Sequence, residues 1–99
     1  MIRKSIVVDA TITQCAVCGK TRELQWHHII HGVANRKLSD KYGLTCWLCM
    51  DCHEHLHSSP DERWRDIDNQ LKVAAQRKFE DQCGHDAWMQ TFNKNYYDD

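Results

Sequence analysis

The second half of the chain carries the clearest periodicity of apolar residues. From position 64 onwards, apolar side chains recur three or four residues apart, which is the spacing of one helix face. The residues of this stripe are Trp64, Ile67, Leu71, Ala75 and Phe79. A shorter helix is expected over residues 85–92, where Trp88 and Phe92 stand one turn apart. Both patterns indicate helices that place aromatic residues in a core.

The residues that flank the long helix predict where it begins and ends. Ser59 has the chemistry of an N-cap, Pro60 suits the first helical position, and Glu62 completes a capping box. Gly84 stands where a helix of this length would end with a residue of positive φ. The sequence therefore predicts one long helix that starts after Ser59 and stops before Gly84.

The first half reads as extended segments rather than helices. The β-branched run at 6–8 predicts a strand or an extended arm, and residues 24–30 and 44–48 predict two strands. Between these strands, residues 31–43 are polar, basic and flanked by glycines. We expect this segment to be the loop of a long hairpin, with a short helical turn over 36–42.

Length and composition suggest one domain that needs a metal for stability. A chain of 99 residues is in the size range where a hydrophobic core alone is marginal. Within it we expect an N-terminal arm at 1–13, a metal-bearing core at 14–57 and a helical part at 58–96. No apolar run approaches the roughly 20 residues that cross a bilayer, so we expect no membrane partner and a cytoplasmic location.

The cysteine spacing predicts a closed zinc site. In a reducing compartment, six cysteines together with seven histidines favour metal binding over disulfides. Cys15 and Cys18 form one CxxC pair, followed by a glycine that suits a zinc knuckle, and Cys49 and Cys52 form another. Cys46 offers a competing pair with Cys49, but it falls within the predicted strand, so we assign it to the core. The alternative for the first pair is two core cysteines without a metal.

The histidine spacing predicts a second, open metal position. We expect a helix from about residue 51 to 57, on which His53 and His57 lie on the same face and can grip one cation. The adjacent His27 and His28 point to opposite sides of a strand, although both can approach one site where the backbone bends. The alternative is two ordinary half-buried histidines bonded to backbone carbonyls.

Charge adds a mild indication of a nucleic-acid partner. The formal net charge is −1, but residues 1–57 hold seven basic residues against five acidic ones, whereas 58–99 hold six against nine. The metal half is therefore the basic half. Arg36, Lys37 and Lys41 in the polar loop can contact phosphate oxygens, or they can simply be solvated.

These motifs together resemble a known family. The CxxCGK turn, the run from Trp26 to Ile29, the basic loop and the segment from Leu48 to His57 resemble the zinc-bearing branch of the HNH nucleases, the ββα-metal or His-Me finger superfamily. Residues 28–32, 35–39, 42–44 and 92–96 are similar to small phage-encoded HNH-like proteins. The resemblance covers roughly residues 15–96. It implies an α+β fold with a ββα-metal, treble-clef-like core, a structural zinc knuckle and two C-terminal helices.

The resemblance also implies an activity and its cofactors. It implies an endonuclease that hydrolyses phosphodiester bonds in DNA, with structural Zn²⁺ and a catalytic Mg²⁺, Mn²⁺ or Ni²⁺. The expected partner is double-stranded DNA, and a homodimer would allow both strands to be cut. The structural zinc would be held by Cys15, Cys18, Cys49 and Cys52.

The resemblance assigns roles to individual residues of the open site. His28 matches the general base, and His27, His53 and His57 match the ligands of the catalytic cation. HNH proteins usually carry an asparagine shortly before the second CxxC, and this chain does not. We assign that middle role to Asn35, the asparagine between the two histidine pairs, with His31 or Asp40 as alternatives.

Two other hypotheses come from different classes. One is a non-catalytic, zinc-stabilised module that binds nucleic acid or a recombination or packaging protein. The other is a single CCHH finger around one zinc, which is a poor fit because it leaves Cys15 and Cys18 without a role. Metal analysis separates the first from the enzyme, since only the enzyme needs a second, exchangeable cation on His53 and His57.

Overall fold

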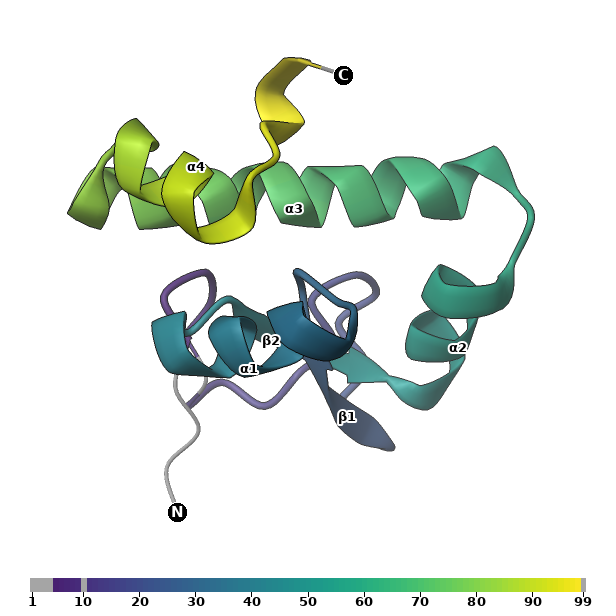
Figure 1. Cartoon of the computed structure of the whole chain (residues 1–99). Helices are drawn as coiled ribbons and strands as arrows, with labels where there is room; N and C mark the ends of the chain where they lie inside the picture. Colours follow the sequence, from purple (N-terminus) through teal and green to yellow (C-terminus); the bar gives the residue numbers. More distant parts are fainter. Residues whose placement is uncertain (1–4, 10, 99) are drawn as a thin grey trace.

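The computed structural model describes residues 5–9 and 11–98 and shows an α+β arrangement (Figure 1). Its sheet consists of two antiparallel strands. In chain order the elements are β1 (Leu24–His28), α1 (Val33–Tyr42), β2 (Thr45–Cys49), α2 (Met50–Ser58), α3 (Glu62–Cys83), α4 (His85–Phe92) and the short 3₁₀ turn η1 (Tyr96–Asp98). The predicted α+β class is therefore confirmed. No helix in the described ranges is both long and apolar enough to cross a membrane.

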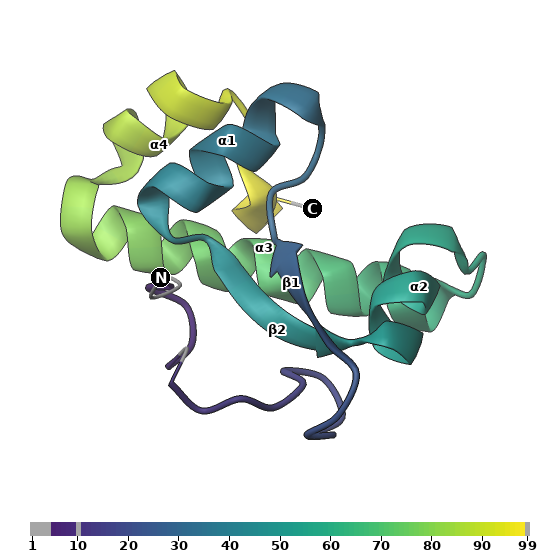
Figure 2. The same ribbon diagram turned by 90° about the horizontal axis from the view of Figure 1, so that it is seen from below.

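The elements form two layers with the core between them. The long helix α3 runs across one layer, and α4 folds back along it (Figure 1). The β1–β2 hairpin and α1 form the other layer, with α2 at one end as the link to α3; Figure 2 shows this layer from below. Apolar residues from both layers are buried between them: Ile29, Ile30, Leu44, Leu48, Trp64, Ala75, Phe79 and Trp88.

The hairpin holds β1 and β2 in a register that sets the positions of the site residues. Trp26 pairs with Trp47 at the centre of the ladder, and their ring centroids lie 4.8 Å apart with edge-to-face packing. Residues 6–8 bend and do not form a strand, the first of the two predictions for this run, and Ile6 N–H donates to Gly43 O at 2.8 Å. Residues 1–4 and 10 of the predicted arm lie outside the described residues.

The segment between the strands is a helix, so the predicted loop is wrong, whereas the helical turn expected over 36–42 is part of this longer helix. Helix α1 spans Val33–Tyr42 and ends at Gly43, whose φ of 72° closes it in the left-handed region. The buried Ser39 Oγ donates to Ile30 O at 2.7 Å, and Leu44 N–H donates to Ser39 O at 2.8 Å. These bonds connect the helix to the ends of both strands, and none of them is visible in local spacing.

Helix α3 is where it was predicted, but its cap is a different residue. Asp61, not Ser59, is the N-cap, since its Oδ1 accepts from Arg63 N–H at 3.0 Å. A carboxylate is the stronger acceptor at the positive end of a helix, and Pro60 therefore lies before the first turn rather than in it. Ser59 Oγ accepts from Asp61 N–H at 3.2 Å instead. The apolar stripe and the stop at Gly84, whose φ is 90°, are confirmed.

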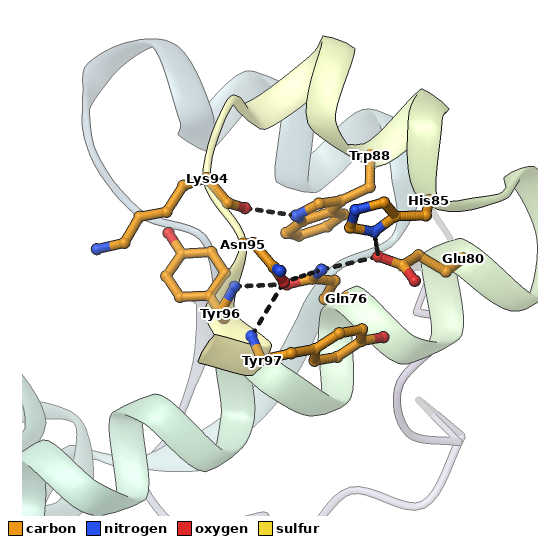
Figure 3. Close-up of polar contacts among 8 residues, drawn as sticks. All are labelled: Gln76, Glu80, His85, Trp88, Lys94, Asn95, Tyr96 and Tyr97. Atoms are coloured by element: carbon orange, nitrogen blue, oxygen red, sulfur yellow. Dashed lines mark hydrogen bonds and ion pairs between the residues drawn. The ribbon is translucent and has the colours of Figure 1, made fainter. Parts of the chain in front are cut away.

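A buried amide fastens the end of the chain to α3 (Figure 3). Gln76 is fully buried, and its Nε2 donates to Glu80 Oε2 at 2.7 Å and to Asn95 Oδ1 at 2.9 Å. Its Oε1 accepts from Tyr96 N–H at 2.8 Å. Because both ends of this buried amide are bonded, burying it costs little, and η1 is held on α3.

Candidate metal centre

Four cysteines come together at one end of the hairpin. The sulfur atoms of Cys15, Cys18, Cys49 and Cys52 all lie within 4.8 Å of one another. Cys18 Sγ and Cys49 Sγ are 3.8 Å apart. A tetrahedral zinc ion with Zn–S bonds of about 2.3 Å separates its sulfurs by about 3.8 Å, so these four residues could hold zinc.

The local backbone of the first CxxC pair forms a tight knuckle. Gly19 adopts a φ of 80°, which a residue with a Cβ rarely adopts, and its N–H donates to Cys15 O at 2.9 Å. Cys15 N–H donates to Lys20 O at 2.8 Å and so closes the turn. Ala16 N–H donates to Trp47 O at 2.8 Å, which fixes the knuckle against β2.

The second pair sits at the junction of strand and helix. Cys49 is the last residue of β2 and the N-cap of α2, and its Sγ accepts from Cys52 N–H at 3.4 Å. Cys46 lies within β2, is buried, and is not part of the sulfur group. Burial, and after it the charge of Cys15, raises the pKa of the Cys46 thiol to about 12. Cys46 is thus the core residue that its strand position predicted.

The electrostatics of the sulfur group favour a bound cation. Burial raises the pKa of the Cys15 thiol, but hydrogen bonds from backbone N–H groups outweigh it and bring that pKa down to about 6. Burial and hydrogen bonds to neighbouring sulfurs raise the pKa of Cys52. A thiolate at Cys15 therefore forms readily beside the Cys52 thiol, which keeps its proton. A divalent cation resolves this conflict because it replaces those protons as the shared partner.

A second group of candidate ligands combines one histidine of β1 with two histidines of α2. Nitrogen atoms of His27 from β1, and of His53 and His57 from α2, lie within 4.8 Å of one another. The ring of His27 is 5.2 Å from that of His53 and 5.4 Å from that of His57, centroid to centroid. The three rings face a pocket of about 320 Å³, lined by Trp26, His27, His28, His31, Arg36, His53 and His57.

His27 is the most unusual residue of this pocket. It is 1% exposed, and within the described part of the chain neither of its ring nitrogens has a hydrogen-bond partner. Burial, and then the neighbouring His53, lowers the pKa of His27 to about 3. The ring is therefore neutral and offers an unused lone pair to the pocket. A bound cation is the partner that such a nitrogen lacks.

A neighbouring amide leaves one ring nitrogen of His53 available as a ligand. His53 Nδ1–H donates to Gln25 Oε1 at 2.5 Å, which leaves Nε2 with its lone pair. Burial, and then His57, lowers the pKa of His53 and favours the neutral ring that a metal needs. Gln25 was not singled out from the sequence. It shares a strand face with His27 two residues later, and this period of two is the signal that could have found it.

His28 lies beside the ligand group but bonds to a different partner. Its Nε2–H donates to Asp40 Oδ1 at 2.9 Å, and both residues are accessible from solvent. Asn35 Nδ2 donates to His31 O at 3.4 Å instead. The geometry therefore favours Asp40, one of the alternatives, over Asn35 as the group that supports His28.

The three residues predicted to contact phosphate do not lie together at one site. Arg36 lines the histidine pocket, one helical turn from Asp40 on α1. Lys37 is exposed and lies outside the residues that line this pocket. Lys41 Nζ lies 5.3 Å from the ring centroid of Tyr42. Of the three, Arg36 is the one positioned beside the candidate ligands.

The class of protein is defined by this fold and these two groups of ligands. It is a small α+β protein with a cysteine cluster that could bind zinc and an adjacent group of histidines with metal-ligand spacing. Comparison of the chain with protein families finds no matching family model. The comparisons with curated proteins and with solved structures find no match either. Function is therefore argued from the site itself.

Proposed function

We propose that this protein is a metal-dependent endonuclease of the HNH, ββα-metal type that hydrolyses phosphodiester bonds in DNA. The observation that carries the proposal is the buried His27, whose ring nitrogens have no hydrogen-bond partner among residues 5–9 and 11–98. It lies beside His53 and His57, in one pocket with His28 and Arg36. The arrangement of the elements supports it, because an antiparallel hairpin leads directly into the helix that carries two of the histidines. Residues proposed to bind a cation, take a proton and hold a phosphate thus line one pocket.

His27, His53 and His57 would hold the catalytic cation. When bound, it would stabilise the negative charge that develops on the phosphate and on the leaving oxygen. Three neutral imidazoles are better ligands for Ni²⁺ than for Mg²⁺, which prefers oxygen. Of Mg²⁺, Mn²⁺ and Ni²⁺, we therefore expect Ni²⁺ to bind most tightly. The four cysteines form the separate, closed zinc site.

His28 is the proposed general base, and Asp40 is its positioning residue. With Nε2–H donated to Asp40, His28 keeps a lone pair on Nδ1, which takes a proton from the attacking water. The water oxygen bonds to phosphorus and the P–O3′ bond breaks. The leaving 3′ oxygen takes a proton from solvent water, so the products are a 5′-phosphate and a 3′-hydroxyl. Arg36 at the rim of the pocket binds a phosphate oxygen and holds the backbone in place.

Plasmid nicking tests the proposal. Zinc-loaded protein is incubated with supercoiled plasmid and added Ni²⁺, Mn²⁺ or Mg²⁺, and nicked circles are expected. His28→Ala should lower the rate by about 10²–10⁴-fold, the usual contribution of a general base. His85→Ala is the matched control, because this exposed histidine on α4 bonds to Glu80, away from the pocket. Undiminished cutting by the His28 variant refutes the base, and failure of the wild type with every cation refutes the enzyme.

The alternative is a non-catalytic zinc module that binds nucleic acid or a recombination or packaging protein. The net charge of −1 and the contact of Asn35 with His31 rather than His28 favour it. Metal analysis of the purified protein distinguishes the two hypotheses. One zinc per chain and no second cation supports the module, whereas a second, exchangeable cation lost in His53→Ala supports the enzyme.

A further inference from the structure

A fourth imidazole lies beside the three proposed ligands without joining them. The ring of His31 is 5.2 Å from that of His57 and 6.2 Å from that of His27, centroid to centroid. His31 also lines the same pocket. Even so, the group whose ligand atoms lie within 4.8 Å of one another comprises His27, His53 and His57 and leaves His31 out. Its ring nitrogens therefore lie more than 4.8 Å from a ligand atom of at least one of the other three.

Helix α3 holds His31 from the other layer of the molecule. His31 Nε2–H donates to Asp68 Oδ1 at 3.4 Å, and Asp68 Oδ2 forms an ion pair with Lys72 Nζ at 2.8 Å. The side chains of Asp68 and Lys72 are only 14% and 16% exposed, so water competes little for this ion pair, whereas the side chain of His31 is 38% exposed. Burial raises the pKa of the Asp68 carboxyl, but the hydrogen bonds from His31 and Lys72 outweigh it and lower that pKa. Asp68 is thus a fixed carboxylate.

The number of imidazoles that reach the cation decides what the site can do. Four protein ligands close a tetrahedral shell and give a structural site, whereas three leave a position for water or substrate. Since the ring of His31 is 5.2 Å from that of His57, we expect a His31 released from Asp68 to compete for the fourth position. Its bond to Asp68 opposes that change.

We propose that Asp68, braced by Lys72, is a positioning residue that holds His31 out of the coordination shell and so keeps one position open for water and phosphate. This inference rests on the proposed function, because it assumes a cation on His27, His53 and His57. It assigns control of the number of metal ligands to residues that do not themselves bind the metal, and it gives α3 a role in the site.

The test compares cation binding before any activity is measured. Co²⁺ is titrated into zinc-loaded protein and followed by calorimetry and by its visible absorption, which reports the number and type of ligands. Asp68→Ala should bind Co²⁺ about 10–100-fold more tightly, the scale on which groups around a metal site change affinity. Its spectrum should be that of a four-ligand, closed site, and its nicking rate should fall.

Two further variants make the assignment specific. Asp68→Ala combined with His31→Ala should return to the wild-type affinity and spectrum, because the added ligand is gone. Lys72→Met removes the ion pair of Asp68 but keeps its carboxylate. It should shift the Co²⁺ affinity and the spectrum in the same direction as Asp68→Ala, but by a smaller amount. It replaces Asp68→Ala in the test if that variant does not fold. The matched control is Asp66→Ala, an exposed acid two residues earlier on α3, which should behave as the wild type.

The possible failures are distinguishable. If the wild type binds Co²⁺ and Asp68→Ala binds it no more tightly, the inference is refuted and the proposed function stands. If His31→Ala alone weakens binding, His31 already belongs to the shell, and the inference is refuted in the same way. A wild type with no second cation refutes the proposed function and this inference together.

Discussion

His27→Leu is expected to stabilise the protein when the histidine site holds no cation. Leucine has nearly the volume of histidine, and His27 is fully buried with two ring nitrogens that lack hydrogen-bond partners among the described residues. A buried unsatisfied polar atom costs about 1–3 kcal/mol, so removing the ring should raise the free energy of unfolding by about 2 kcal/mol at pH 7.5. For a domain of this size, each kcal/mol raises Tm by about 4–8 °C.

The gap between the two proteins should widen in acid. Because the folded protein lowers the pKa of His27 to about 3, the unfolded chain binds more protons than the folded one between about pH 3 and 6.5. Wild-type stability therefore falls as pH falls through this window. The loss from this one group is about 2 kcal/mol between pH 7.5 and 5, and His27→Leu should not show it.

Urea unfolding of zinc-loaded protein at pH 7.5 and 5, with and without Ni²⁺, measures these differences. Free Ni²⁺ at a hundred times its Kd should stabilise the wild type by about 2.7 kcal/mol and leave His27→Leu unchanged. A variant less stable than the wild type at pH 7.5 would show that the His27 ring has partners that offset its burial. A variant that is still stabilised by Ni²⁺ would show that His27 is not a ligand.

Three further predictions concern the other parts of the site. Asp40→Ala should slow nicking by roughly 10–100-fold, less than loss of the base itself at 10²–10⁴-fold, with unchanged zinc content. Arg36→Ala should lower the slope of log Kd for duplex DNA against log salt by about 0.9, measured by fluorescence anisotropy, whereas Lys37→Ala, outside the pocket, should change it less. Cys49→Ser should lose zinc and cooperative unfolding, because structural zinc supplies on the order of 10 kcal/mol of folding free energy; Cys83→Ser, at an exposed cysteine, should keep one zinc per chain by elemental analysis.

The ligand groups could be predicted from the sequence because their spacing is local. Residues three apart around a knuckle or at the start of a helix bring two sulfurs together whatever the rest of the chain does, and His53 and His57 share a helix face for the same reason. The apolar stripe of α3 is local in the same sense. To bring the two CxxC pairs together, the chain has only to form the antiparallel strand pair that lies between them.

What the sequence did not reveal depends on contacts between distant residues. Helix α1 has a polar sequence that locally resembles a loop. It is stabilised by the bond from Ser39 to Ile30 and by its connections to the ends of the strands, which the local sequence does not show. Once that segment is helical, Asn35 and Asp40 stand about 140° apart around its axis, and one of them faces His28 while the other does not. Asp68 lies 37 residues from His31, and no spacing rule connects them.

Helix α2 would couple the binding of the two proposed ions. Its N-cap is Cys49, its first turn contains Cys52, and its nine residues also include His53 and His57. Without zinc, the first turn of this helix would no longer be fixed at its cysteines. The rings of His53 and His57 would then move away from His27. We expect the two ions to bind in sequence, with zinc first. A chelator selective for zinc, or an oxidant of thiols, should therefore abolish DNA cleavage even when the second cation is in excess. A newly made chain would then acquire the ability to damage DNA only after its first ion has arrived.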